Sequence, residues 1–280
     1  MFFLFFCAGG AGPSTADESL RIISLAPATT EILFALGLDK QIIGISSYCN
    51  YPDQAKNKER VGTFSEPNIE KIISLKPDMI FCTGLEQAPI VENLRKLGFT
   101  VYVSDPVNIT ALFSSILEIG RVTGKQTEAG ILVNGMKQNI DEIFSLVKSI
   151  PKEEKPKVFI EIWHDPLMTA GNHSYIDQLI SLAGGTNIAF DTRRPYSCFS
   201  AEQVIKRDPD CIILTYMTGG DTNPLDILKN RIGWKNISAV KNKRVFNDMN
   251  PDLFLRPGPR LPEALRLLYF KLYPQTCELN

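Results

Sequence analysis

One segment of this 280-residue chain occurs twice. Residues 68–80 read NIEKIISLKPDMI and residues 200–212 read SAEQVIKRDPDCI, so Glu70 aligns with Glu202, and the Pro-Asp pairs that follow align at the same offset. In each copy the pattern predicts a helix that begins after a capping residue, carries apolar residues at helical spacing and ends at Pro-Asp before an apolar strand. Two copies of one helix–strand unit predict two similar lobes.

Short apolar strands alternate with helices on both sides of the repeat, which is typical of a mostly parallel sheet with helices on its faces. Residues 110–150 lack any strand pattern, and apolar residues at helical spacing predict one long helix over residues 126–149. At about 1.5 Å per residue this helix would span roughly 35 Å, which is about the length of a small domain. The predicted fold class is therefore α/β, with two similar Rossmann-like lobes joined by a single long rigid helix.

The domain boundaries follow from this pattern. We expect a leader and linker over residues 1–18, an N-terminal α/β lobe over 19–108, a helical segment with the bridging helix over 109–150, and a C-terminal α/β lobe over 157–276. The predicted strands cover residues 22–25, 42–45, 79–82, 100–103, 158–162, 211–216 and 244–246.

Composition excludes several classes of function. The formal net charge is −1 and the basic residues are dispersed, so the chain has no electrostatic footprint for nucleic acid. It contains no GxGxxG, P-loop, GxSxG or HExxH motif, only two histidines, and six cysteines without zinc-type spacing. We expect no catalytic residues, no resident cofactor and no metal site, and we expect most of the cysteines to be buried as small hydrophobic residues.

The N-terminus carries the only targeting signal. Residues 1–8 are apolar and residues 9–13 are small or proline, which resembles the end of a secretory signal peptide that is too short to span a membrane. The basic region is missing, so either the true start lies upstream or the segment is not a signal. Cys7 is a candidate for lipid attachment, although Phe6 stands where a bacterial lipobox has a small residue. We expect a periplasmic or extracytoplasmic protein, released or lipid-anchored.

Aromatic residues gather in segments that follow strands, where open α/β sheets place their ligand crevices. Any one of them alone packs under its own loop more often than it contacts a ligand. Their distribution over matching segments of two lobes nevertheless predicts a flat-walled cleft for a large, partly apolar ligand. The aromatic candidates are Tyr48, Tyr51, Phe64, Trp163, Tyr196, Phe199 and Phe254; the polar candidates are Asp165, Asp252 and Arg256, with His164 as a ligand for a metal centre carried by the bound molecule.

The stretches RIISLAPATTEILFALG, IGISSYCNYP, VGTFSEPNIEKIISLKPDMI and RRPYSCFSAEQVIKRDPDCII, with the long helix between them, resemble the substrate-binding proteins of bacterial ABC importers for corrinoids, haem and iron siderophores. The resemblance runs from Arg21 to about Tyr273 and is strongest to the vitamin B12-binding members. It implies two lobes that hold a ligand between them with little hinge motion. It also implies a non-enzymatic monomer, peripheral to the membrane, whose partner is the permease dimer.

The resemblance also assigns roles to matching residues. In the family, a glutamate near the start of the repeat helix in each lobe docks onto arginines of the permease dimer, and Glu70 and Glu202 stand at these positions. The alternative for both is a purely structural role, because an acidic residue in the first turn stabilises a helix through its dipole.

The family's corrinoid-contacting aromatic positions match Tyr48, Phe64 and Tyr196, and its polar positions match Asp252 and Arg256. The chain departs from the pattern where the vitamin B12-binding members carry tryptophan, since Phe64, Tyr196 and Leu253 stand there. The resemblance is therefore more specific for the family than for the ligand.

Three hypotheses follow. The first is an extracytoplasmic protein that captures a cobalt corrinoid and delivers it to an ABC importer. The second keeps the importer and changes the ligand to haem, which favours an axial His, Tyr or Met, or to a ferric siderophore, for which Arg193, Arg194 and Arg256 are candidate contacts. The third is a cytoplasmic α/β enzyme acting on a tetrapyrrole, because architecture alone does not fix function.

Overall fold

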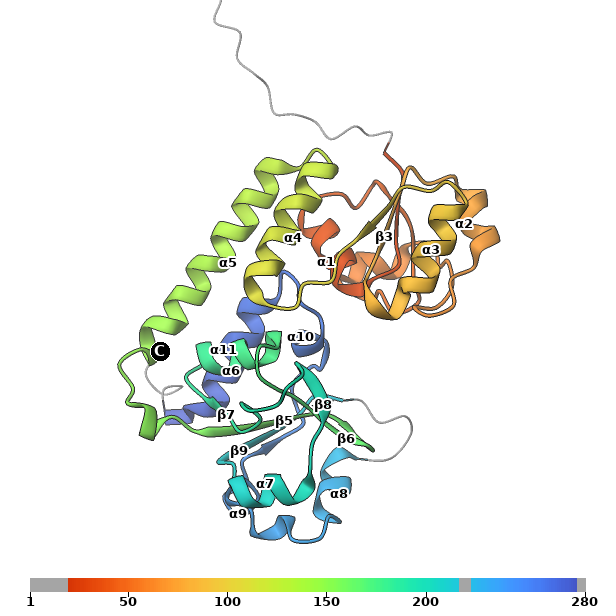
Figure 1. Cartoon of the computed structure of the whole chain (residues 1–280). Helices are drawn as coiled ribbons and strands as arrows, with labels where there is room; N and C mark the ends of the chain where they lie inside the picture. Colours follow the sequence, from red (N-terminus) through yellow and green to blue (C-terminus); the bar gives the residue numbers. More distant parts are fainter. Residues whose placement is uncertain (1–19, 217–222, 276–280) are drawn as a thin grey trace, which may run out of the picture.

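The computed structural model describes residues 20–216 and 223–275, and Figure 1 shows two lobes connected by helices. The N-terminal lobe holds a four-stranded sheet in the order β2-β1-β3-β4, with every pair parallel. Its strands are β1 (Ile22–Ser24), β2 (Ile42–Ile45), β3 (Met79–Cys82) and β4 (Val101–Val103). Its helices are α1 (Pro27–Ala35), α2 (Ile69–Leu75) and α3 (Ala88–Lys96), with short 3-10 turns η1 (Asp53–Asn57) and η2 (Leu85–Gln87).

The C-terminal lobe holds a six-stranded sheet in the order β10-β9-β5-β6-β8, with β7 paired to β5. Its strands are β5 (Lys157–His164), β6 (Leu167–Ala170), β7 (Thr186–Asn187), β8 (Tyr196–Cys198), β9 (Cys211–Leu214) and β10 (Val245–Phe246). Its helices are α6 (Tyr175–Leu182), α7 (Ala201–Arg207), α8 (Pro224–Lys229), α9 (Ser238–Lys241), α10 (Asp252–Leu255) and α11 (Leu261–Leu272), with 3-10 turns η3 (Lys152–Glu154) and η4 (Trp234–Asn236). The predicted two-lobed α/β fold is confirmed.

The prediction of a mostly parallel sheet misses one feature of the second lobe. Strand β6 pairs antiparallel with β5 and with β8. Both β6 and β8 are short, and β8 is a partly exposed edge strand, so neither carries the apolar run that marks a buried strand. Tyr196 consequently begins a strand and does not lie in a loop.

The two repeat copies share their backbone details. Helices α2 and α7 begin after Asn68 and Ser200, whose side chains accept hydrogen bonds from backbone N–H groups, and both helices end at a left-handed residue. The carboxylate of Asp78 accepts the backbone N–H of Arg21 at 2.8 Å, and the carboxylate of Asp210 accepts that of Lys157 at 2.8 Å. Each aspartate thus fixes the strand that follows the helix against the first strand of its lobe.

Helices α4 (Ile109–Val122) and α5 (Gln126–Val147) connect the lobes. Figure 1 shows them running antiparallel, with α5 reaching from the N-terminal lobe to the C-terminal lobe. Buried side chains of α5, including Met136 and Ile143, belong to one apolar core that extends from Ile22 in β1 to Cys211 in β9. Full burial of each large apolar side chain stabilises the fold by about 1.5–3 kcal/mol, so a core shared by both lobes opposes hinge motion.

Among the described residues, no helix has the length and apolar character that crossing a membrane requires.

Candidate functional site

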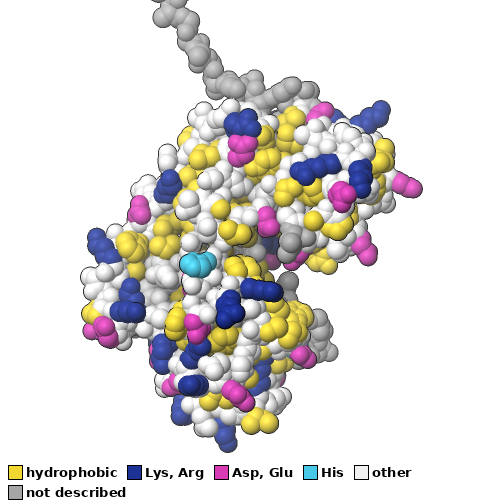
Figure 2. Space-filling model, in the orientation of Figure 1, with side chains coloured by type: hydrophobic (Ala, Val, Ile, Leu, Met, Phe, Trp, Pro, Cys, Tyr) yellow, Lys and Arg dark blue, Asp and Glu magenta, His cyan; other side chains and the backbone are white. Residues whose placement is uncertain are grey.

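The surface is indented between the two lobes, on the side of the molecule away from α5 (Figure 2). Four of the predicted aromatic residues carry large side chains that the fold leaves partly uncovered: Tyr48 is 58% exposed, Tyr51 is 44% exposed, Trp163 is 42% exposed and Tyr196 is 45% exposed. Tyr48 follows β2 in the first lobe, whereas Trp163 in β5 and Tyr196 in β8 belong to the second. The aromatic surface is therefore contributed by both lobes.

A hydrogen bond and an electrostatic interaction across the lobes involve two of these residues. The carbonyl oxygen of Tyr48 accepts a hydrogen bond from Nη2 of Arg256 at 3.2 Å, which ties the turn after β2 to the end of α10. Tyr196 lies within electrostatic reach of Asp105 in the opposite lobe. Partial burial, reinforced by the negative charge of Asp105, raises the pKa of Tyr196 to about 12, so its hydroxyl stays protonated and able to donate.

Phe64 is half-buried in the loop before α2, and a buried glutamine fixes that loop. Nε2 of Gln87 donates to the carbonyl oxygen of Phe64 at 2.7 Å, and Oε1 of Gln87 accepts the backbone N–H of Thr83 at 2.8 Å. No sequence pattern predicts a role for Gln87, because a lone glutamine at the start of a helix carries no motif.

Trp163 belongs to a cluster of three rings at the ends of β5 and β9. Its indole N–H donates to the carbonyl oxygen of Asp165 at 2.8 Å, and its ring centroid lies 5.0 Å from that of His164 and 6.2 Å from that of Tyr216. His164 and Tyr216 stack at 5.3 Å. Nδ1 of His164 and the hydroxyl of Tyr216 are buried and have no hydrogen-bond partner among the described residues.

A buried ion pair between Glu161 and Arg231 lies on the interior side of this cluster. Glu161 in β5 is fully buried and accepts two hydrogen bonds from Arg231, at 2.5 and 2.8 Å, while the guanidinium lies 4.4 Å from the ring centroid of Trp234. Burial, together with the charge of Glu161, raises the pKa of Tyr216 well above its usual value. The cluster therefore exposes the ring of Trp163 at the surface and has the Glu161–Arg231 ion pair in its interior.

Arg256 and Asp252, which are both predicted ligand contacts, pair with each other and with other residues of the protein. Arg256 is 13% exposed at its side chain and is occupied by the protein: it donates to Asn50 at 2.7 Å, pairs with Asp252 at 3.0 Å and lies 3.4 Å from the carboxylate of Glu31. Because Glu31 belongs to α1 and Arg256 to the C-terminal lobe, this network ties the lobes together.

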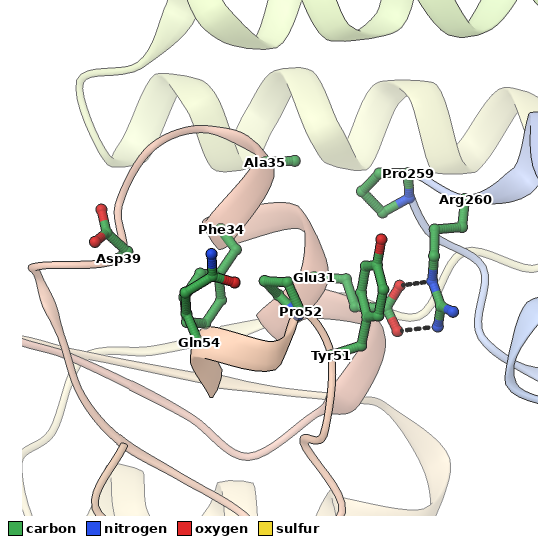
Figure 3. Close-up of a pocket in the computed structure, with 9 residues that line it drawn as sticks. All are labelled: Glu31, Phe34, Ala35, Asp39, Tyr51, Pro52, Gln54, Pro259 and Arg260. Carbon is green, nitrogen blue, oxygen red and sulfur yellow. Dashed lines mark hydrogen bonds and ion pairs between the residues drawn. The ribbon is translucent and has the colours of Figure 1, made fainter. Parts of the chain in front are cut away.

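Glu31 is the central residue of that network, and no sequence pattern indicates this role. Its buried carboxylate receives two hydrogen bonds from Arg260, at 2.8 and 2.6 Å, and the ring of Tyr51 lies over the Arg260 guanidinium at 3.9 Å (Figure 3). Burial alone would lower the pKa of Arg260, but the ion pair with Glu31 outweighs it and raises that pKa. Tyr51 thereby serves the tie between the lobes.

The pocket drawn in Figure 3 has a volume of about 510 Å³ and lies beside α1 and η1. Its lining includes Arg260 and one of the predicted aromatic candidates, Tyr51. Both lobes contribute to it, with Glu31 and Tyr51 from the first lobe and Pro259 and Arg260 from the second.

Phe254 differs from the expectation that it contacts a ligand. It lies in α10, is fully buried and packs in the shared apolar core, so a ligand cannot reach it. The sequence pattern identifies an aromatic residue near a strand end but not the direction in which it points. Phe254 therefore contributes packing that supports the loop carrying Arg256.

The paired glutamates lie in the first turns of α2 and α7. Glu70 and Glu202 are both exposed, and neither forms an ion pair with a described residue. Figure 1 places α2 on the outer part of one lobe and α7 on the outer part of the other. The two carboxylates are thus free to meet cations of another molecule.

Three of the four described cysteines, Cys49, Cys82 and Cys211, are buried as expected; Cys198 is exposed, and all four are free thiols. Desolvation raises the pKa of Cys82 and of Cys211 to about 12, so both are unreactive thiols.

Within residues 20–216 and 223–275, no group of three or more potential ligands is arranged for a metal ion. Cys7 and Cys277 lie outside the described residues.

Comparison with known proteins gives consistent matches. A family model described as periplasmic binding protein matches residues 22–251. An uncharacterized ABC transporter substrate-binding lipoprotein of Bacillus subtilis is 34% identical over 264 residues, which cover 92% of this chain and 82% of that protein. The vitamin B12-binding protein of Yersinia pestis is 32% identical over 261 residues, covering 91% of this chain and 86% of that protein.

Two solved structures extend the comparison. The periplasmic vitamin B12-binding protein of Vibrio cholerae is 30% identical with a TM-score of 0.74, covering 90% of this chain and 96% of that chain. A periplasmic heme-binding protein from Roseiflexus sp. RS-1, in apo form, is 25% identical with a TM-score of 0.79, covering 91% and 98%. These similarities run through both lobes and the helices between them.

Proposed function

This chain belongs to the periplasmic binding protein family and is a substrate-binding protein of an ABC importer, and on that premise we propose that it captures a corrinoid of the vitamin B12 type and delivers it to the permease. Members of this family bind and hand over small molecules and are not enzymes. We place the protein in the periplasm or on the outer face of the cytoplasmic membrane. The Bacillus relative is named as a lipoprotein.

The observation that carries the ligand proposal is the set of exposed aromatic rings on both lobes, formed by Tyr48, Trp163 and Tyr196, with Phe64 half-buried in the wall of the first lobe. A corrin ring is large, flat and partly apolar, and its rim carries neutral amides. Aromatic side chains offer flat apolar faces to such a ring, and protonated tyrosine hydroxyls offer donors to amide oxygens. The curated vitamin B12-binding relative supports the same ligand class.

Haem is the second candidate. Tyr48 presents an exposed phenol, and tyrosine is one of the axial ligands that proteins supply to haem iron. A ferric siderophore is less well supported, because Arg256, one of its three candidate contacts, is already paired with Asp252 and Asn50. Absorbance of the bound ligand separates these candidates directly.

Truncating the aromatic rings tests the proposed site. We expect Tyr48→Ala, Trp163→Ala and Tyr196→Ala each to weaken cyanocobalamin binding about tenfold, because a lost aromatic contact costs on the order of 1–2 kcal/mol. Isothermal titration of each variant measures the loss. Phe190→Ala is the matched control, because Phe190 is an exposed aromatic residue that does not belong to the proposed site. Its ring packs on Arg207. Cyanocobalamin binding that is equal in all five proteins would contradict this site.

A further inference from the structure

Asp105 lies on the same wall of the junction as Phe64. It follows β4, and its Oδ1 accepts a hydrogen bond from the hydroxyl of Thr83 at 3.2 Å. The backbone N–H of Thr83 donates to Gln87, which is the residue that holds the carbonyl of Phe64. One continuous set of hydrogen bonds therefore positions Asp105 relative to a proposed ligand contact.

The second carboxylate oxygen of Asp105 lies against the backbone of Gly84. A Cβ atom at residue 84 would come within 2.3 Å of Oδ2 of Asp105, so any larger residue would displace the carboxylate. The side chain of Asp105 is exposed and forms no ion pair with a described residue. Oδ2 is thus held in place, carries negative charge and is available to accept a hydrogen bond.

The opposite wall carries Tyr196, which lies within electrostatic reach of Asp105. The cations nearest to Tyr196 in sequence are Arg193 and Arg194, both exposed, and neither pairs with Asp105. A ligand held between Phe64 and Tyr196 would therefore meet an uncompensated carboxylate at its rim.

We propose that Asp105 selects for ligands whose rim carries neutral amides and against ligands whose rim carries carboxylates. A primary amide of a corrinoid donates an N–H to Oδ2, whereas a carboxylate at the same place is repelled, and both effects are strong where the ligand excludes water. This inference rests on the proposed function and deepens it, because it states why this junction would take an amide-bearing corrinoid and reject haem with its two propionates.

The test uses two probes that share one corrin ring. Cobinamide carries amides around the ring, and cobyrinic acid carries carboxylates in their place. We expect the wild-type protein to prefer cobinamide, and we expect Asp105→Asn to bind cobyrinic acid and haem at least about tenfold more tightly than wild type, with cobinamide affinity unchanged or lower. Titration at low and high salt checks the cause, because added salt screens repulsion and should reduce the preference only in wild type.

Glu92→Gln is the matched control. It removes the same unit of charge from an exposed carboxylate of the same lobe, on α3 and paired with Lys96, and should leave all three affinities unchanged. An identical ratio of cobinamide to cobyrinic acid affinity in wild type and Asp105→Asn would overturn the role of Asp105 and leave corrinoid binding standing. Binding of haem with no binding of either corrinoid to the wild-type protein would overturn both the proposed function and this inference.

Discussion

Replacing Glu70 and Glu202 together by glutamine should abolish uptake of the ligand and leave its affinity for the protein unchanged. Both carboxylates are exposed at the starts of α2 and α7 and are unpaired among the described residues, so they contribute little to the fold. Close charge pairs across an interface are worth about 1.5 kcal/mol or more each. Loss of two pairs should therefore weaken docking at least about a hundredfold.

The measurement pairs calorimetry of the purified variant with uptake of labelled cyanocobalamin by proteoliposomes that contain the permease. Each single variant should give an intermediate rate if each lobe docks on one half of a permease dimer, as we propose. A double variant with Glu92→Gln, an exposed carboxylate, and Glu128→Gln, a partly exposed one, controls for the loss of net charge. Full uptake by the Glu70/Glu202 double variant would contradict the docking assignment. A loss of ligand affinity as large as the loss of uptake would also contradict it.

A structural role for these glutamates makes a different prediction. If Glu70 only stabilises α2 through the helix dipole, its replacement should lower stability by about 0.3–1 kcal/mol and leave the uptake rate unchanged. Thermal denaturation of the same variants therefore separates the two roles.

Replacing Glu31 by alanine should lower the free energy of unfolding by about 3–5 kcal/mol. Its buried carboxylate lies between Arg256 and Arg260, whose side chains are only 13% and 12% exposed, so removing it leaves two guanidinium groups near each other without their shared anion. The network joins α1 to the C-terminal lobe, so the variant should also loosen the junction where we propose that the ligand binds.

Denaturant unfolding followed by tryptophan fluorescence measures this loss. Glu118→Ala is the matched control, because Glu118 pairs with Arg121 on the exposed surface of α4, where such a pair is worth about 0–1 kcal/mol. A loss for Glu31→Ala no larger than that of the control would show that the network does not hold the lobes together.

The repeated segment explains why so much of the fold is predictable. Helices α2 and α7 begin after the predicted capping residues Asn68 and Ser200, and the predicted helix over residues 126–149 corresponds to α5 at Gln126–Val147. These features depend on local patterns of apolar residues and caps. The antiparallel strands β6 and β8 do not depend on such local patterns, because both are short and are specified by their neighbours in the sheet.

The site is predictable only in part, for a related reason. Spacing along the chain identified Tyr48, Trp163 and Tyr196, whose rings are exposed, but it cannot tell them from Phe254, which points into the core. The partners of Glu31 are 225 and 229 residues away in sequence, so no local pattern indicates that Arg256 and Arg260 serve the tie between lobes.

The most direct test of this account is a parallel calorimetric titration of the purified protein with cyanocobalamin, cobinamide, haem and a ferric siderophore. The account predicts one-to-one, sub-micromolar binding of the corrinoids and weaker binding of the other two ligands. Binding of haem or the siderophore in the same range, with no heat from either corrinoid, would contradict the proposed ligand.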